Sequence, residues 1–239
     1  LTRVPGSFNK ITKAIENTKK LGIKVRMNIT VTKENYFQLE NFAKMLLKYK
    51  PDAVNFIKFN PWDIAKKESS KLYPFYKDIE PHLHRAIDIL EPYVTKITVR
   101  YIPYCFMQGY EKNVCNAVHL EFDSDEWWLP SVQTKMKKHS LKDIILFIKK
   151  IIKNIPNLIC LKPSLSFDKI MTNLLIKKHY FKPIQCRKCK YYFICDGIDN
   201  VYAEIYDLDE IKPIIGKKIR TPMAYRGPYL ENYEKKYNI

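Results

Sequence analysis

Hydrophobic and polar positions in the first hundred residues follow two alternating spacings. Residues 7–21 carry apolar side chains at helical spacing, with Ser7 as the expected N-cap, and residues 23–31 alternate apolar and polar side chains as a strand does. Strands that alternate with helices of roughly ten to fifteen residues are typical of βαβ units, so the pattern predicts a parallel sheet. The two spacings recur further along, predicting helices over 35–49 and 76–90 and strands over 53–59 and 96–101.

The chain changes character near its middle. Residues 1–103 contain about three βα units, which predicts part of a (β/α) barrel that is expected to begin upstream of this chain. Residues 104–239 are predicted as a smaller, irregular α+β region: a hairpin-like segment over 104–135, an amphipathic helix over 141–155 and a cysteine motif within 182–226. The helix is expected to pack on a protein core rather than lie on a membrane. The fold class is therefore α/β, a partial barrel followed by a small cysteine-rich domain.

The composition disfavours some classes of partner. The 239 residues carry 35 Lys and 7 Arg against 25 acidic residues, a net charge of +17. Nucleic-acid surfaces favour clustered Arg, whereas these lysines are spread along a chain rich in Ile and Asn, so nucleic acid is not the favoured partner. No uninterrupted apolar stretch has the length of a bilayer, which argues against a membrane partner. Six cysteines without a secretory signal favour a reducing cytoplasm over a disulfide scaffold.

The most specific chemical signal is a group of three cysteines near the C-terminal end. Cys186, Cys189 and Cys195 are spaced as C-x₂-C-x₅-C, and Gly197 follows shortly after the third. A C-x₂-C turn directs two thiolates at one metal centre, and the longer arm brings a third from another side. Tetrahedral zinc and iron–sulfur clusters both use this arrangement, so the spacing predicts a metal site without identifying the metal.

The fourth ligand has no candidate beside the motif. His179 lies seven residues before Cys186, outside the usual spacing of a zinc site. Cys105 and Cys115 are the remaining candidates because both lie in a polar, glycine-containing segment. Cys160 stands within Leu-Ile-Cys-Leu and is interpreted as a small buried core residue.

The half-barrel, followed by Ile-Pro-Tyr-Cys-Phe-Met-Gln-Gly around Cys105 and then by the three-cysteine motif with Asp196 and Gly197, resembles a radical S-adenosylmethionine (radical SAM) protein. More narrowly, it is similar to members with a C-terminal SPASM or twitch-like extension. The resemblance implies an auxiliary iron–sulfur cluster, expected as [4Fe–4S], on the three motif cysteines and Cys105. Cys115 ranks below Cys105, because Cys105 stands where the family has its matching cysteine.

The resemblance implies a parent enzyme that reductively cleaves S-adenosylmethionine. The 5′-deoxyadenosyl radical would abstract hydrogen from a substrate that the sequence does not identify, a peptide being one candidate, and an electron donor would be a partner. Asn28 shares a strand face with Arg26, and both are expected to point into the barrel, where they are candidate contacts of the nucleoside. A polar residue bonded to its neighbours is the commoner explanation. The family's C-x₃-C-x₂-C loop does not occur here, so catalytic residues are unassigned and the chain alone is given no activity.

Two other hypotheses come from different classes of protein. The first is a zinc-stabilised, basic nucleic-acid-binding module without catalysis. The second is a half-barrel that has lost its chemistry and acts as a binding scaffold. Iron and sulfide content separates both from the iron–sulfur hypothesis.

Overall fold

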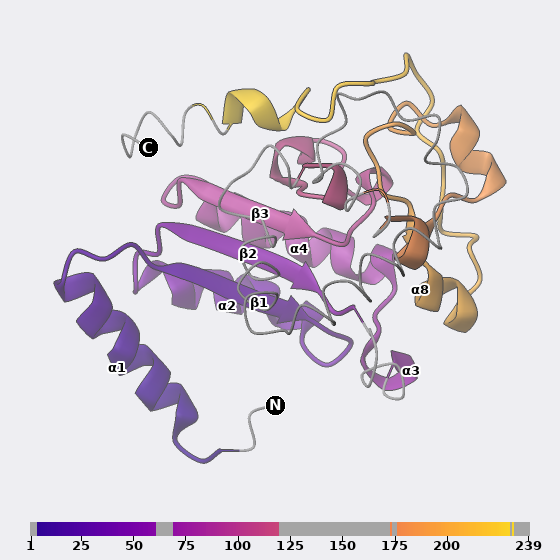
Figure 1. The fold of residues 1–239 in the computed structure, drawn as a ribbon. Coiled ribbons are helices and arrows are strands. Elements are labelled where there is room, and N and C mark those ends of the chain that lie inside the picture. Colours follow the sequence, from indigo (N-terminus) through magenta and orange to yellow (C-terminus); the bar gives the residue numbers. More distant parts are fainter. Residues whose placement is uncertain (1–3, 61–68, 120–172, 174–175, 230, 232–239) are drawn as a thin grey trace, which may run out of the picture.

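The computed structural model describes residues 4–60, 69–119, 173, 176–229 and 231 (Figure 1). Its larger part is a three-stranded parallel sheet in the order β1-β2-β3, with helices α2 and α4 together on one face. The parallel sheet and its alternation with helices are therefore confirmed. The elements of this part are α1 (Ser7–Lys20), β1 (Arg26–Val31), η1 (Tyr36–Gln38), α2 (Leu39–Leu47), β2 (Ala53–Lys58), α3 (Ser69–Leu72), α4 (Tyr76–Leu90) and β3 (Lys96–Arg100).

The core of this part lies between the sheet and the helices α2 and α4. Ile29, Phe56 and Val99 are neighbours in register across the three strands, and the latter two are fully buried. Leu83 and Ile87 repeat at i and i+4 along α4, so one stripe of that helix is buried. The alternating apolar side chains of the strands and the helically spaced ones of α4 thus form one buried layer.

The opposite face of the sheet is polar. The register places Asn28, Asn55 and Thr98 side by side across the three strands. Arg226, from the C-terminal segment, is fully buried here and donates to the Thr98 Oγ1 atom at 3.2 Å and to the Asn113 carbonyl at 3.4 Å. A buried guanidinium therefore ties the C-terminal segment to this face.

Helix α1 stands apart from the sheet (Figure 1), and none of its residues is buried. Phe8 and Ile11 are 57% and 53% exposed. The expectation that Ser7 caps this helix is wrong, because Ser7 is its first helical residue and Gly6 occupies the N-cap position with φ 72°. Glycine takes that left-handed conformation without the cost that a Cβ atom would add.

The second part contains little regular structure. A two-stranded antiparallel sheet joins β4 (Tyr180–Phe181) to β5 (Ile198–Asp199). The other elements are short: η3 (Tyr104–Phe106), η4 (Glu111–Asn113), η5 (Ala117–His119), η7 (Ile184–Lys188) and α8 (Asn200–Ile205). Glu210 attaches this part to α4, since its carboxylate accepts from the backbone N–H groups of Tyr76 and Lys77 at 3.2 and 3.1 Å.

The protein is thus a mixed α/β structure with a parallel sheet and a small antiparallel one. The expected helix over 141–155, the second half of the segment 104–135 and Cys160 lie outside the described residues. Within the described ranges, no helix combines the length and the apolar character needed to cross a bilayer.

Candidate metal centre

Four cysteines line one cavity in the second part of the protein. Cys105 lines it together with Cys186, Cys189 and Cys195, although it is far from them in sequence. The remaining walls are largely apolar or aromatic, with two lysines among them: Pro103, Tyr104, Lys182, Tyr191, Tyr192, Gly197, Ile198, Ile211, Lys212 and Pro213. Among the described residues that form this lining there is neither a histidine nor a carboxylate.

The two residues that flank Cys105 each stack on an aromatic ring, and the two rings belong to different parts of the protein. Tyr104, before it, stacks on Tyr191 of the cysteine motif with ring centroids 4.9 Å apart. Phe106, after it, stacks on Tyr76 of α4 at 5.2 Å. The turn that carries Cys105 is therefore fixed to both parts of the protein, and the thiol stays at the cavity.

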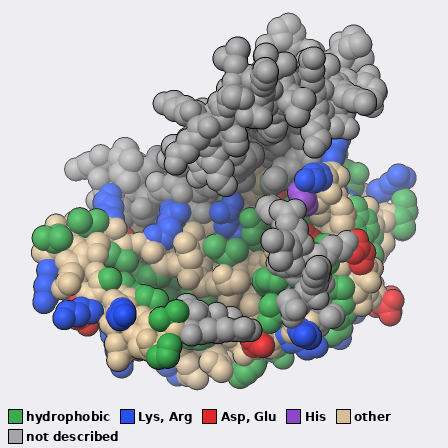
Figure 2. Space-filling view, turned by 60° about the horizontal axis from the view of Figure 1, so that its bottom comes forward, with side chains coloured by type: hydrophobic (Ala, Val, Ile, Leu, Met, Phe, Trp, Pro, Cys, Tyr) green, Lys and Arg blue, Asp and Glu red, His purple; other side chains and the backbone are tan. Residues whose placement is uncertain are grey.

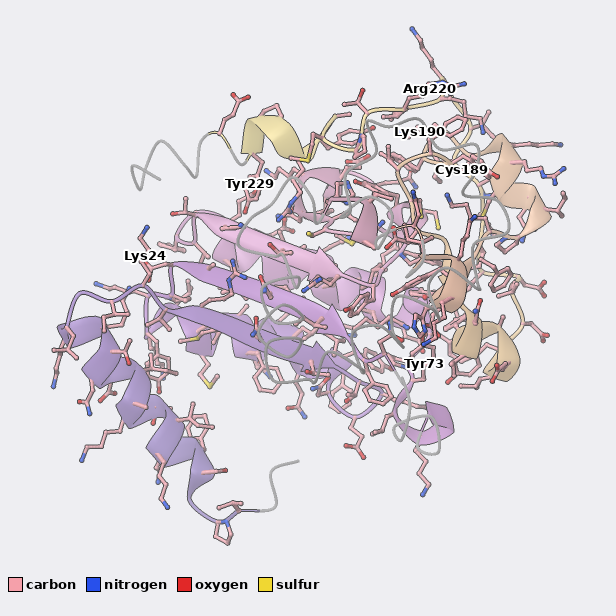
Figure 3. All side chains as sticks on the ribbon, in the orientation of Figure 1. Lys24, Tyr73, Cys189, Lys190, Arg220 and Tyr229 are labelled. Carbon is pink, nitrogen blue, oxygen red and sulfur yellow. The ribbon has the colours of Figure 1, made fainter. Side chains whose placement is uncertain are left out.

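The motif cysteines are shaped by local turns. The Cys189 N–H donates to the Cys186 carbonyl at 2.9 Å, and the Cys195 N–H donates to the Tyr191 carbonyl at 3.0 Å. The segment 214–219 is hydrogen-bonded to the motif. The Lys190 N–H donates to the Ile214 carbonyl, and the Ile219 N–H donates to the Lys190 carbonyl. Figure 3 shows Cys189 and Lys190 together at this corner of the molecule.

Gly197 allows the backbone to turn close to the antiparallel pair. Its φ is +105°, and a Cβ atom there would lie 2.2 Å from the Phe181 carbonyl oxygen. No larger residue fits this position without movement of the backbone. The sequence shows this glycine two residues after Cys195, but it does not show that the Phe181 carbonyl lies against it.

Burial dominates the electrostatics of the thiols. It raises the pKa of Cys105 well above the ordinary value, and the other three cysteines of the cavity raise it further. Burial also raises the pKa of Cys195 to about 11, although the backbone N–H groups of Tyr104 and Gly197 donate to this sulfur and act in the opposite direction. Metal binding to such thiols would release protons.

Asp196 is a positioning residue that sequence reasoning missed. It is buried, and its carboxylate accepts from the N–H of Ala117 at 2.6 Å and from the N–H of Val118 at 3.4 Å. Burial is the main reason that the pKa of Asp196 rises to about 6. The residue fastens the end of the motif to the turn η5, and the Asp-Gly pair after Cys195 was the available signal.

Two lysines bind backbone carbonyls of the motif. Lys182 Nζ donates to the Tyr192 carbonyl at 2.6 Å, and Lys218 Nζ donates to the Cys189 carbonyl at 2.9 Å. Both amines act to lower the pKa of Cys186, against the larger upward effects of burial and Cys189. Positive charge therefore stands next to the sulfurs, which favours a thiolate-bound anionic group there.

The other predicted residues lie elsewhere. Cys115 is buried, and its N–H donates to the Val99 carbonyl at 2.8 Å, but it does not line the cysteine cavity. Asn28 and Arg26 share the polar face of β1, as the alternation predicts, and they too lie outside the cavity lining. The structure thus brings together the four predicted metal-ligating cysteines and separates them from the two predicted nucleoside contacts.

No group of three Cys, His, Asp or Glu side chains within the described residues is placed to hold a single metal ion. A mononuclear zinc site gathers four donors on one ion, whereas a [4Fe–4S] cluster binds each thiolate to a different iron. The four thiols around this largely apolar cavity are the described residues that could hold a metal centre.

Comparisons of the chain with protein-family models, with curated proteins and with solved structures give no match.

Proposed function

We propose that this chain is the C-terminal part of a radical SAM enzyme and that it binds an auxiliary [4Fe–4S] cluster. The ligands would be Cys105, Cys186, Cys189 and Cys195. The observation that carries the proposal is that these four thiols, from two distant segments, line one cavity. When bound, the cluster supplies a one-electron redox centre, and the N–H groups directed at Cys195 would tune its potential.

The parallel sheet supports the barrel half of the proposal. In a partial (β/α) barrel, the polar face with Asn28, Asn55 and Thr98 would be the interior, and α2 and α4 would form the outer ring. S-adenosylmethionine would lie against the interior face, near Asn28 and Arg26, and would supply the radical in the parent enzyme. The substrate, a peptide being one candidate, and the electron donor would be its partners.

Anaerobic reconstitution with iron and sulfide tests the cluster. We expect a brown protein with about four irons and four sulfides per chain, as a [4Fe–4S] cluster requires. Cys105→Ala and Cys189→Ala should lose most of that iron. The matched control is Cys115→Ala, since Cys115 is a buried thiol that stands outside the cavity.

Two outcomes would contradict the proposal. A colourless protein that binds one zinc per chain would support the zinc-stabilised module instead. Loss of iron in Cys115→Ala with retention in Cys105→Ala would show that the wrong fourth ligand has been assigned. Circular dichroism of each variant distinguishes loss of iron from loss of the fold, and Cys105→Ser provides a second, less disruptive substitution.

A further inference from the structure

Two segments that contribute to the lining of the cysteine cavity carry positive charge without any negative charge. Residues 182–195 and 212–220 contain eight Lys or Arg and neither Asp nor Glu. The two segments are paired, since Cys189 forms an antiparallel bridge with Ile215. The eight cations are Lys182, Arg187, Lys188, Lys190, Lys212, Lys217, Lys218 and Arg220.

This basic surface, defined by those eight cations, differs from the rest of the described molecule. Elsewhere the charges are mixed: Glu16 stands among the lysines of α1, and Glu40 pairs with Arg85 at 2.7 Å. On the face shown in Figure 2, basic side chains are scattered among hydrophobic and polar ones. The overall net charge is thus spread out, whereas the basic surface concentrates one sign.

The basic surface also exposes apolar side chains. Ile184 and Ile215 are 69% and 70% exposed, and Phe193 is 40% exposed. Exposed isoleucines bordered by cations are a combination found at protein–protein interfaces rather than on an inert solvated surface. Figure 3 shows Arg220 and Lys190 at the same corner as Cys189, which forms the bridge to Ile215.

The same short segments contain the cysteines or contact them. Cys186 is half-buried, and its neighbours Arg187 and Lys188 are exposed. Lys218 Nζ donates to the carbonyl of Cys189. A protein docked on the basic surface would therefore be within one layer of side chains of a centre bound to these cysteines.

Nucleic acid is the other polyanion that the charge would suit, and the aromatic side chains argue against it. Bases of single strands stack on open aromatic faces. Here the Arg220 guanidinium lies 4.3 Å from the centroid of Phe193, and Lys182 and Lys218 lie 4.8 and 5.1 Å from the centroid of Tyr192. A cation therefore already lies against each of these two rings and would compete with a stacking base.

We infer that the basic surface docks an acidic one-electron carrier protein. The inference rests on the proposed function, because it names a partner of the same cysteine site. A reduced carrier passes one electron to the oxidised auxiliary centre and becomes oxidised by one electron. No bond forms or breaks, and no proton moves. Charge complementarity raises the rate of encounter, and the exposed isoleucines define the contact.

The test uses the reconstituted protein and a reduced acidic ferredoxin, mixed anaerobically in a stopped-flow spectrometer. Lys188→Glu/Lys217→Glu should lower the second-order rate of reduction by about tenfold or more at low salt. The control Lys10→Glu/Lys13→Glu makes the same change in net charge on exposed positions of α1 and should stay within about twofold. A second pair, Arg187→Glu/Arg220→Glu, should reproduce the loss. Reduction by dithionite should be similar in all four proteins, which shows that the cluster is intact.

Three results would overturn the inference. If the cluster forms but its reduction by ferredoxin is independent of salt and of charge reversal, the carrier does not dock here. If charge reversal abolishes binding of a single-stranded oligonucleotide and leaves the reduction rate unchanged, the surface binds nucleic acid instead. A protein that takes up no cluster overturns the proposed function itself, and this inference with it.

Discussion

The parallel sheet and the cysteine region are held together in different ways. The sheet has strands of five or six residues and a continuous apolar layer against α2 and α4. The strands of the cysteine region have two residues, and this region depends on stacked rings and on buried polar side chains that bind backbone groups. Burial of apolar area stabilises the first, whereas particular contacts shape the second.

The difference shows where each part is vulnerable. A regular apolar layer tolerates the loss of any single polar contact but not the loss of buried volume. An irregular region with few backbone ladders depends on a small number of positions where the chain must turn or a polar group must be satisfied. The next experiments test this contrast, beginning with the largest expected effect.

Removal of buried volume from α4 should destabilise the whole protein. Leu83 is fully buried, and Leu83→Ala should lower the free energy of unfolding by about 3 kcal/mol. Leu21→Ala is the same chemical change at a position that is 75% exposed, and it should cost about 0.5 kcal/mol or less. Denaturant unfolding measures both. Equal effects would show that the layer over the sheet is not the dominant core.

Substitution of Gly197 should damage the cysteine region selectively. Gly197 and Gly109 both have positive φ, at 105° and 83°, but a Cβ atom at Gly109 would meet open space. Gly197→Ala should therefore cost about 2 kcal/mol more than Gly109→Ala, because it adds a steric clash to the same conformational strain. Hydrogen exchange should show faster opening near β4 and β5 while the amides of β2 stay protected. Uniform loss of protection would contradict the separation of the two regions.

Lys58 joins the two regions and gives the stability a pH dependence. It is buried at the end of β2, with Nζ 3.4 Å from the Tyr73 ring centroid and 5.4 Å from that of Tyr202. Burial holds the pKa of Lys58 well below its ordinary value of 10.5, against the weaker opposing charges of Asp199 and Glu210.

The unfolded chain therefore binds more protons than the folded one between the lowered pKa and 10.5. Stability rises with pH through that window, by up to about 1.4 kcal/mol per pH unit for one proton. Lys58→Met should remove this slope, and unfolding at several pH values measures it. Lys44→Met, at an exposed lysine of α2 that is hydrated in both states, is the control. If stability depends on pH in Lys58→Met as steeply as in the wild type, burial of Lys58 is not the cause of that dependence.

The smallest effect is expected at the attachment of α1. Lys19 Nζ pairs with Asp52 at 2.9 Å, and both side chains are partly exposed. Lys19→Ala should cost about 0.5 kcal/mol, since partly exposed ion pairs contribute little. Lys20→Ala, at the exposed neighbour, should cost less, and salt should erase the difference. A cost several times larger would mean that α1 is anchored more firmly than its lack of buried residues indicates.

Several features were predictable because they depend on local sequence. Helix α4 was predicted with the observed ends, since its apolar residues repeat at helical spacing and residues 91–95 break the pattern. Strand β2 was predicted to within one residue for a similar reason. The N-terminus of α1 was misplaced by one residue, because a left-handed glycine and a serine are both common at that position.

The cysteine site was predictable in part. The spacing of Cys186, Cys189 and Cys195 indicates convergent thiols on its own, because short turns fix their separation. The Asp-Gly pair marks Asp196 as part of the motif, but the backbone groups that Asp196 and Lys218 bind were not predictable, since they come from distant segments. Nothing in local periodicity reports such contacts.

The sequence by itself determined the alternation of helices and strands, the spacing of three thiols and the excess of positive charge. Tertiary structure decided that Cys105 rather than Cys115 lines the cavity, because the rings of Tyr104 and Phe106 fix its turn between two parts of the chain. It also decided that eight of the cations share one surface, since the pairing of residues 182–195 with 212–220 brings them together. Periodicity is a property of neighbouring residues, whereas the composition of a cavity or a surface depends on long-range packing.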